Sequence, residues 1–224
     1  MKYSASFEVV NMLDSAVAVP IGASATLTGH CRIPPGATGL VAFVHGSGSS
    51  RHSPRNKQVA DYLNDQGLGT LLFDLLTEDE GRRRQNVFDI DLLADRIAGV
   101  RSWLAEDAEL SVLPLGLFGA STGAAAALVS AATQPEGVAA IVSRGGRVDL
   151  AGRWLGKVIA PTLFIVGGDD QQVLVWNEES ARQLRCEHQL QVVEGATHLF
   201  EEPGALEEVA GLAASWFITH LRVR

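Results

Sequence analysis

The chain has 224 residues, 46% of them hydrophobic and 20% charged, and a formal net charge of −8. This length suits one folded domain with a substantial core, so we expect a single domain over residues 1–224. The acidic balance argues against a nucleic-acid partner, because phosphate binding needs a basic face.

Two cysteines, Cys31 and Cys186, are too few and too far apart to form a disulfide framework or a metal-binding motif. Residues 1–10 lack the apolar core of a signal peptide, and no apolar run approaches the roughly 20 residues of a membrane span. We therefore expect a cytoplasmic protein with free thiols and no membrane partner. Nothing in the sequence indicates the oligomeric state.

The first predicted elements form an antiparallel hairpin, because residues 15–22 and 23–33 alternate in polarity around a glycine. The apolar runs that follow are continuous, which is typical of parallel strands buried on both faces. These runs span residues 40–46, 68–76, 112–119, 138–146, 160–168 and, in a shorter version, 190–196.

Helical segments separate these runs. Residues 54–67 open with proline and close with glycine, and residues 89–107 place apolar side chains on one face. Residues 121–134 are rich in alanine, and residues 204–221 close the chain. The alternation predicts an α/β fold: a mostly parallel sheet of about eight strands with an N-terminal antiparallel hairpin and helices on both faces. The longest loop, residues 76–89, leaves little room for a lid domain.

The segment G-A-S-T-G, residues 119–123, lies between an apolar run and the alanine-rich segment. In this context G-x-S-x-G predicts a nucleophile elbow, a tight turn in which the serine takes strained backbone angles. Ser121 is the candidate nucleophile, and the N–H of Thr122 at the helix N-terminus is a candidate donor to an oxyanion. The alternative is a plain turn of small residues.

A serine hydroxyl needs a base, and the base needs an orienting group. His198 follows the last apolar run and is the candidate base, while Asp169 and Asp170 follow the run before it and are the candidate acids. The order Ser, Asp, His is that of the α/β hydrolases. In the loop H-G-S-G after the first parallel run, the N–H of Ser47 is the candidate second donor to the oxyanion.

Two other interpretations of this region fit less well. A phosphate-binding loop would need Lys before Ser or Thr, and a dinucleotide fingerprint would need glycine where Arg51 stands. A metal site formed by His45, His52 and His198 would need a carboxylate ligand that the sequence does not identify. We therefore expect no metal and no other cofactor.

Together these residues resemble the α/β-hydrolase superfamily over nearly the whole chain, and within it the small, lidless dienelactone hydrolase-like group. The matching segments are VHGSGSSRHSPRN, LLFDLLTEDE, GLFGASTGAAAAL, SRGGRVDLAG, PTLFIVGGDDQQV and GATHLFEEPGALEEVA. The resemblance implies that fold and a hydrolase activity. It assigns the acid to Asp170, which matches a G-x-x-D-x-x-V motif beginning at Gly167. It gives His198 the role of the base, and Ser47 and Thr122 those of oxyanion donors.

The founding dienelactone hydrolases are known for a cysteine nucleophile, where this chain has Ser121. A serine alkoxide depends more on its base and favours ordinary ester chemistry. Short loops predict an open site for small esters. Arginine forks bind carboxylate and phosphate well, so an anionic substrate group is a second hypothesis. Its candidate contacts near strand ends are Arg51, His52, Arg55, Arg144 and Arg147, and the alternative is ion pairing of these arginines with Glu78, Asp79, Glu201 or Glu202.

The main functional hypothesis is a serine hydrolase acting on small carboxylic esters, lactones and thioesters included, with Ser121, His198 and Asp170 as a triad. One alternative is acyl transfer by the same residues to an acceptor other than water. The other is a binding module without catalysis on a hydrolase fold.

Overall fold

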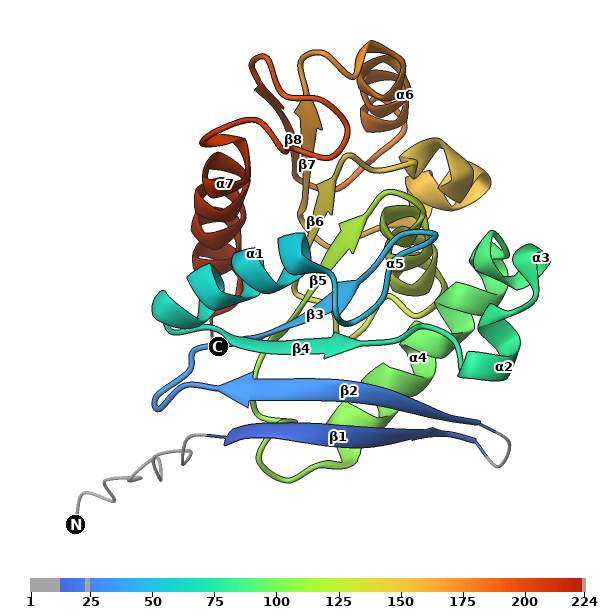
Figure 1. Cartoon of the computed structure of the whole chain (residues 1–224), viewed down its shortest axis with the longest axis vertical. Helices are drawn as coiled ribbons and strands as arrows, with labels where there is room; N and C mark the ends of the chain where they lie inside the picture. The colour runs from blue at the N-terminus through green and yellow to red at the C-terminus, as the bar shows by residue number, and fades with distance from the viewer. Residues whose placement is uncertain (1–12, 23–24, 223–224) are drawn as a thin grey trace.

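The computed structural model describes residues 13–22 and 25–222 and shows an eight-stranded sheet between two layers of helices (Figure 1). The expectation for residues 1–10 lies outside the described part of the chain. In chain order the strands are β1 (Leu13–Ile21), β2 (Ala25–Ile33), β3 (Leu40–Val44), β4 (Gly69–Phe73), β5 (Leu115–Ala120), β6 (Ala140–Arg144), β7 (Thr162–Gly167) and β8 (His188–Val193).

The order of the strands in the sheet is β1-β2-β4-β3-β5-β6-β7-β8. β1 and β2 form the predicted antiparallel hairpin, and β2 also pairs with β4 in antiparallel fashion. All pairs from β4 to β8 are parallel. The continuous apolar runs explain this arrangement, because every residue of the five strands from β3 to β7 is buried, whereas burial along β1 alternates. The predicted fold class is confirmed.

Two hydrophobic cores lie on the two faces of the sheet. α1 (Pro54–Asp65) and α7 (Ala205–His220) cover one face, and α4 (Ile90–Glu106) and α5 (Thr122–Thr133) cover the other (Figure 1). α5 is buried along nearly its whole length. Its alanines are small enough to let the helix backbone approach the sheet closely, which brings the start of α5 against the ends of β3 and β5.

Four further elements were not among the predicted helices: α2 (Glu78–Gly81), α3 (Arg84–Val87), the 3-10 segment η1 (Val148–Lys157) and α6 (Gln171–Ala181). α2 and α3 lie in the predicted loop of residues 76–89, and a capping box at Thr77 closes the first turn of α2. Within the described residues this connection is too short to form a lid domain. None of the helices in the described part of the chain combines the length and apolar character needed to cross a lipid bilayer.

Candidate active site

Ser121 stands between β5 and α5 in the backbone conformation of a nucleophile elbow. Its φ is 50° and its ψ is −124°, angles that cost a non-glycine residue about 1–3 kcal/mol. The flanking glycines make the turn possible. A Cβ on Gly123 would lie 2.2 Å from the carbonyl oxygen of Val44, and one on Gly119 would lie 2.5 Å from the Cα of Ala124. The close approach of three backbone segments therefore fixes Ser121.

Backbone hydrogen bonds hold the strained residue. The N–H of Ser121 donates to the carbonyl of Arg144 at 3.2 Å, and the carbonyl of Ser121 accepts from the N–H groups of Ala124 and Arg147 at 3.1 and 3.0 Å. The end of β6 is thus tied directly to the turn that carries the serine.

The predicted base and acid are hydrogen-bonded to each other: His198 Nδ1 lies 2.6 Å from Asp170 Oδ2. Asp170 follows β7 and His198 follows β8. A Cβ on Gly167 would lie 2.2 Å from the carbonyl oxygen of Ala196, so glycine lets the two loops meet. The carboxylate is mostly buried and the imidazole is more open, with 15% and 38% of the side chains exposed. Asp169 does not share in this bond: its N–H donates to Ala196.

His198 also approaches the turn of Ser121 from the side of β6. A Cβ on Gly145, whose φ is 52°, would lie 3.5 Å from His198 Cε1. Among the described residues, the hydrogen bonds include none between Ser121 Oγ and His198. In unliganded enzymes this bond is often long and tightens only when substrate binds.

The loop after β3 lies against the nucleophile. A Cβ on Gly46 would lie 2.9 Å from the Cβ of Ser121. The N–H of Ser47 donates to Thr122 Oγ1 at 2.9 Å, so the predicted second oxyanion donor already has an acceptor. The N–H of Thr122 has no backbone acceptor among the described residues, as expected at a helix N-terminus.

The four arginines predicted as substrate contacts differ in whether they already have an ion-pair partner. Arg51 is paired with Asp74, and Arg147 donates to both oxygens of Asp149. Arg55 donates to Glu201 at 2.8 Å, one of the ion pairs considered as the alternative to substrate binding. Its Nε is buried, with no acceptor in the described part of the chain.

Arg144 differs from the other three. It is 8% exposed, its Nη1 has no acceptor, and no carboxylate of the described residues lies within 4.0 Å. Burial, and secondarily the positive charge of Arg55, lowers the pKa of Arg144 to about 10. The guanidinium is therefore still charged at neutral pH, 5.9 Å from the centre of the Phe118 ring.

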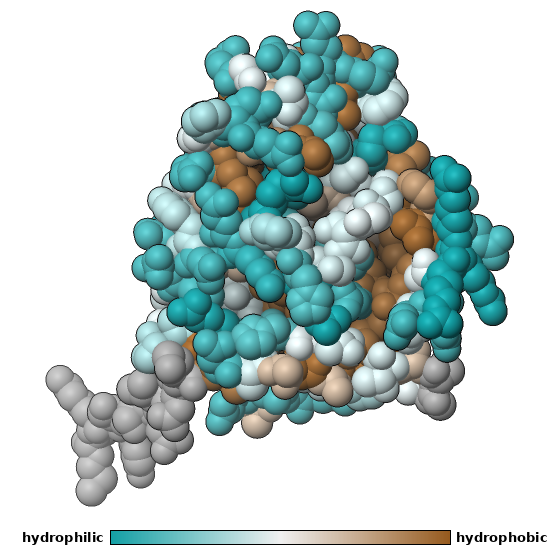
Figure 2. Space-filling view, in the orientation of Figure 1, coloured by the Kyte–Doolittle hydropathy of each residue, from teal (hydrophilic) through white to brown (hydrophobic). Residues whose placement is uncertain are grey.

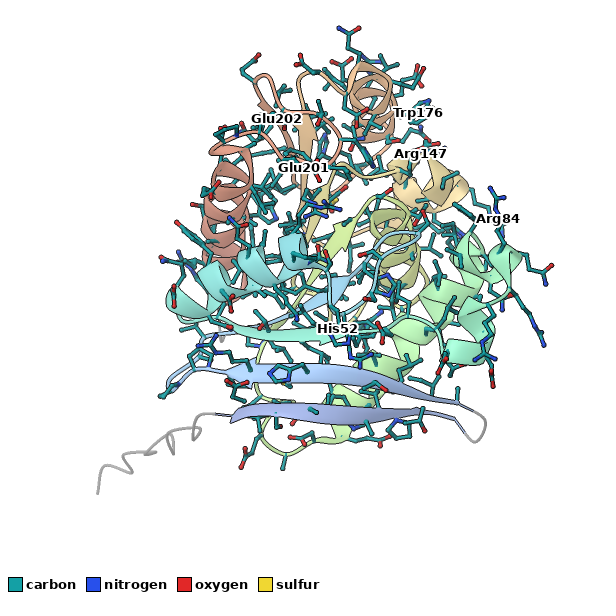
Figure 3. All side chains as sticks on the ribbon, in the orientation of Figure 1. His52, Arg84, Arg147, Trp176, Glu201 and Glu202 are labelled. Atoms are coloured by element: carbon teal, nitrogen blue, oxygen red, sulfur yellow. The ribbon has the colours of Figure 1, made fainter. Side chains whose placement is uncertain are left out.

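His52 lies apart from Arg147 in Figure 3 and lines a hollow of about 430 Å³ between α1, β2 and β4. Trp176 of α6, which the sequence did not single out, lies beside Arg147, whose guanidinium carbon is 4.1 Å from the centre of the indole. Only the folded structure brings this pair together, because α6 and the loop after β6 are not neighbours in sequence.

A second hollow adjoins the loop that contacts Ser121. It has about 520 Å³ and lies between Ser47 and the segment of α2 and α3. Most of its lining is polar or glycine, and the apolar side chains in it are Leu75, Leu76, Val87 and Leu93. Figure 2 shows brown, apolar surface between the centre of the molecule and a hydrophilic arm on the right. The sequence placed Leu75 and Leu76 in an apolar run and Leu93 on a predicted helix, but it gave no sign that these side chains meet Val87 around one hollow.

A larger hollow of about 800 Å³ lies elsewhere, at the amino ends of the strands beside Leu40 and Leu115. None of the predicted catalytic residues lines it. Within the part of the chain that the structure describes, no three His, Cys, Asp or Glu side chains gather in a way that could hold a metal ion.

A strand–serine–helix turn, with an Asp–His pair from later loops at the same edge of a parallel sheet, is the arrangement of an α/β hydrolase. Solved structures agree. A dienelactone hydrolase from Anabaena variabilis is 52% identical to this chain, covers 95% of it and 100% of its own length, and superposes with a TM-score of 0.92. The chain belongs to the dienelactone hydrolase family.

More distant structures share the fold. Est1E from Butyrivibrio proteoclasticus is 16% identical, covers 92% of this chain and 98% of its own, and has a TM-score of 0.78. The relationship to the Anabaena protein supports an enzyme of the hydrolase type.

Among curated proteins, a "putative phosphoribosyl transferase" of Mycobacterium tuberculosis is 58% identical over 195 residues, in both of two strains. The match covers 87% of this chain but 44% of that protein, so the chain spans less than half the length of the curated relatives it matches. No family model matches the chain.

Proposed function

We propose that the chain is a serine hydrolase that cleaves small carboxylic esters, lactones and thioesters included, through an acyl-enzyme on Ser121. One observation carries the proposal: a strained serine at a strand-to-helix turn lies at the same sheet edge as a hydrogen-bonded Asp170–His198 pair. Strain of this kind persists at functional sites, where the surrounding structure holds it in place.

The proposed reaction uses these three side chains in turn. His198 Nε2 takes the proton of Ser121 Oγ as this oxygen attacks the substrate carbonyl, and Asp170 accepts the Nδ1–H bond of the imidazolium that forms. The tetrahedral oxyanion is stabilised beside the N–H of Thr122. The leaving alcohol then departs with the proton from His198. A water molecule, deprotonated by the same imidazole, hydrolyses the acyl-enzyme and regenerates the hydroxyl.

The hollow beside Ser47 is the proposed site of the apolar part of the substrate. It has about 520 Å³, within the range of small-molecule sites. The hollow is lined mostly by polar residues and glycines, and the apolar part of its lining, Leu75, Leu76, Val87 and Leu93, suits a short hydrocarbon or aryl group. This size favours small esters over long lipids.

We further propose that the substrate carries an anionic group, which Arg144 binds with help from Arg55. Support comes from the buried, unpaired guanidinium of Arg144 and the unpartnered Nε of Arg55. Arg51 and Arg147 are committed to Asp74 and Asp149, so they are weaker candidates for this role.

The name of the Mycobacterium relatives suggests a different reaction, phosphoribosyl transfer. More than half of their length lies outside the match. We propose that the matched portion is a hydrolase unit and that phosphoribosyl transfer, if those proteins perform it, belongs to the remaining portion.

The test is hydrolysis of a small aryl ester by the wild type and by Ser121→Ala, with labelling by a fluorophosphonate probe. We expect the substitution to lower kcat by several orders of magnitude and to abolish labelling. Ser215→Ala is the matched control, because its hydroxyl is exposed on α7 and bonds the carbonyl of Gly211. Hydrolysis that survives in Ser121→Ala would show the proposal to be wrong. Product analysis with added alcohols or thiols separates hydrolysis from acyl transfer.

A further inference from the structure

We propose that the side-chain hydroxyl of Thr122 is the second donor to the oxyanion, and that the N–H of Ser47 acts through this hydroxyl rather than on the substrate. The inference rests on the proposed serine-hydrolase function. It changes the predicted role of Ser47 from a direct donor to a positioning group.

The first observation is the bond between the two residues. The N–H of Ser47 points at Thr122 Oγ1, at 2.9 Å. A hydroxyl has one proton to donate and two lone pairs that accept. Because Oγ1 accepts from Ser47, its own proton stays available, and among the described residues no acceptor is bonded to it. Thr122 is 4% exposed, so its side chain is held by the surrounding packing.

The second observation is that the direction of the Ser47 N–H is fixed. Leu75 N–H donates to His45 Nε2 at 3.1 Å, so the neutral imidazole carries its proton on Nδ1, which donates to the carbonyl of Gly46 at 3.0 Å. That carbonyl and the N–H of Ser47 belong to one trans peptide and point in opposite directions. The carbonyl of Gly46 also accepts from the N–H of Ser49 at 3.2 Å, so His45 and this turn together direct the N–H of Ser47 toward Thr122.

His45 is suited to this role because it stays neutral. Burial is the largest influence and lowers the pKa of its imidazole below the usual value. A protonated ring would present an N–H to the N–H of Leu75 and lose that bond. Above its folded pKa, His45 thus keeps the tautomer that orients the loop.

The third observation places the hydroxyl beside the reaction. Thr122 follows the nucleophile directly, and Gly46 packs against the Cβ of Ser121. On attack, the carbonyl oxygen gains negative charge and accepts from two groups of one residue, the N–H and the O–H of Thr122. A hydroxyl that already accepts from an N–H is polarised, so it is a stronger donor. The proton stays on Oγ1, because the step is hydrogen bonding and not proton transfer.

The test is Thr122→Val, which keeps the branched shape and removes the donor. If the hydroxyl binds the oxyanion, kcat for a small aryl ester falls roughly 100- to 1,000-fold while KM changes little, as for loss of one oxyanion donor. Thr122→Ser should restore most of the rate. The affinity of an aryl trifluoromethyl ketone, whose oxygen occupies the oxyanion site after addition of Ser121, should fall in parallel.

The competing arrangement predicts the opposite sign. In this alternative the N–H of Ser47 donates directly to the oxyanion, and it bonds the hydroxyl of Thr122 only while no substrate is bound. Thr122→Val then frees this N–H, and kcat stays equal or rises, which would overturn the proposal. Thr133→Val, at the other end of α5, is the matched control, and Thr122→Ala repeats the comparison should the valine variant not fold. Hydrolysis that survives in Ser121→Ala would overturn both the proposed function and the role of the Thr122 hydroxyl. A wild-type rate in Thr122→Val would overturn only the role of the Thr122 hydroxyl.

Discussion

A buried guanidinium without a carboxylate partner is costly, and Arg144 is such a residue. Removing a charge from water costs free energy that an ion pair would partly return, and Arg55 beside it adds like-charge repulsion. The aromatic face of Phe118 offsets only part of this cost. A bound carboxylate or phosphate would supply the missing acceptor.

Replacing Arg144 with Met should therefore separate stability from selectivity. We expect kcat/KM for a carboxylated aryl ester to fall roughly 10- to 100-fold more than kcat/KM for its neutral counterpart, since a hydrogen bond to a charged group is worth about 1.5–3 kcal/mol. Because an unpaired buried charge is removed, the free energy of unfolding should stay equal or rise. Steady-state kinetics on the ester pair and urea denaturation measure both quantities.

Arg32→Met is the control for the loss of an arginine, because β2 is four strands away from β6 in the sheet and Arg32 pairs with Asp61. It should leave the ratio of the two esters unchanged. Equal losses for both esters in Arg144→Met would show that the anionic site does not exist.

Among the elements, α5 depends most on close packing, because its first turn meets the carbonyl ends of β3. Gly123 lies at this contact, and a Cβ there would lie 2.2 Å from the Val44 oxygen and 2.5 Å from the His45 oxygen. Real contacts cannot be that short, so either the helix or the loop after β3 must move. That loop carries Ser47, which ties the packing of α5 to the proposed oxyanion site.

Gly123→Ala should lower the free energy of unfolding by about 1–3 kcal/mol, the usual cost of overpacking a tight interior. It should also lower kcat, because displacement of α5 misplaces Ser121. Urea denaturation gives the first quantity from a change in midpoint at constant slope. Gly81→Ala is the matched control, since a Cβ there meets no atom within 4 Å. If both variants were equally stable, the tight contact would not exist in solution.

The elements that the sequence predicted correctly share one property, which is a strong apolar pattern. Continuous runs indicated the buried strands. Ser121 and the pair Asp169 and Asp170 became candidates because they follow the ends of such runs, while His198 stands in the loop after the last one. The choice of Asp170 over Asp169 came from the family resemblance. α6 shows why other elements were missed: its buried residues are Val173, Asn177 and Ser180, only one of them apolar, so it carries no amphipathic signal.

The contacts of the charged side chains were the least predictable part of the site. Glu78 and Asp79, considered as partners for the site arginines, pair instead with Arg82 of their own segment. Arg147 is paired with Asp149, two residues away, while Arg144 has no carboxylate partner among residues 13–22 and 25–222. Which arginine stays free depends on how the loops pack in three dimensions, and residue order alone does not contain this information.

For the whole molecule, the position of the N-terminal hairpin raises the question of how firmly it is held. β1 and β2 end the sheet beyond β4, and the hairpin packs against α4 in the larger core. Cys31 of β2 lies in this core with no exposed surface. Burial, with a smaller effect from Asp107, raises the pKa of its thiol to about 12. At pH 8 in the folded protein, Cys31 is therefore neither accessible nor ionised.

In the Cys186→Ser variant, which leaves one thiol, we expect almost no labelling of native protein by a thiol-specific reagent at pH 8. In the unfolded chain the thiol pKa returns to about 8.5, so about a quarter of the Cys31 thiols are reactive thiolates at pH 8. If the hairpin opens only when the whole sheet does, the labelling rate rises with urea as steeply as global unfolding does. A rate that is appreciable without urea and nearly independent of it would mean that β1 and β2 detach locally from α4 while the rest of the sheet stays folded.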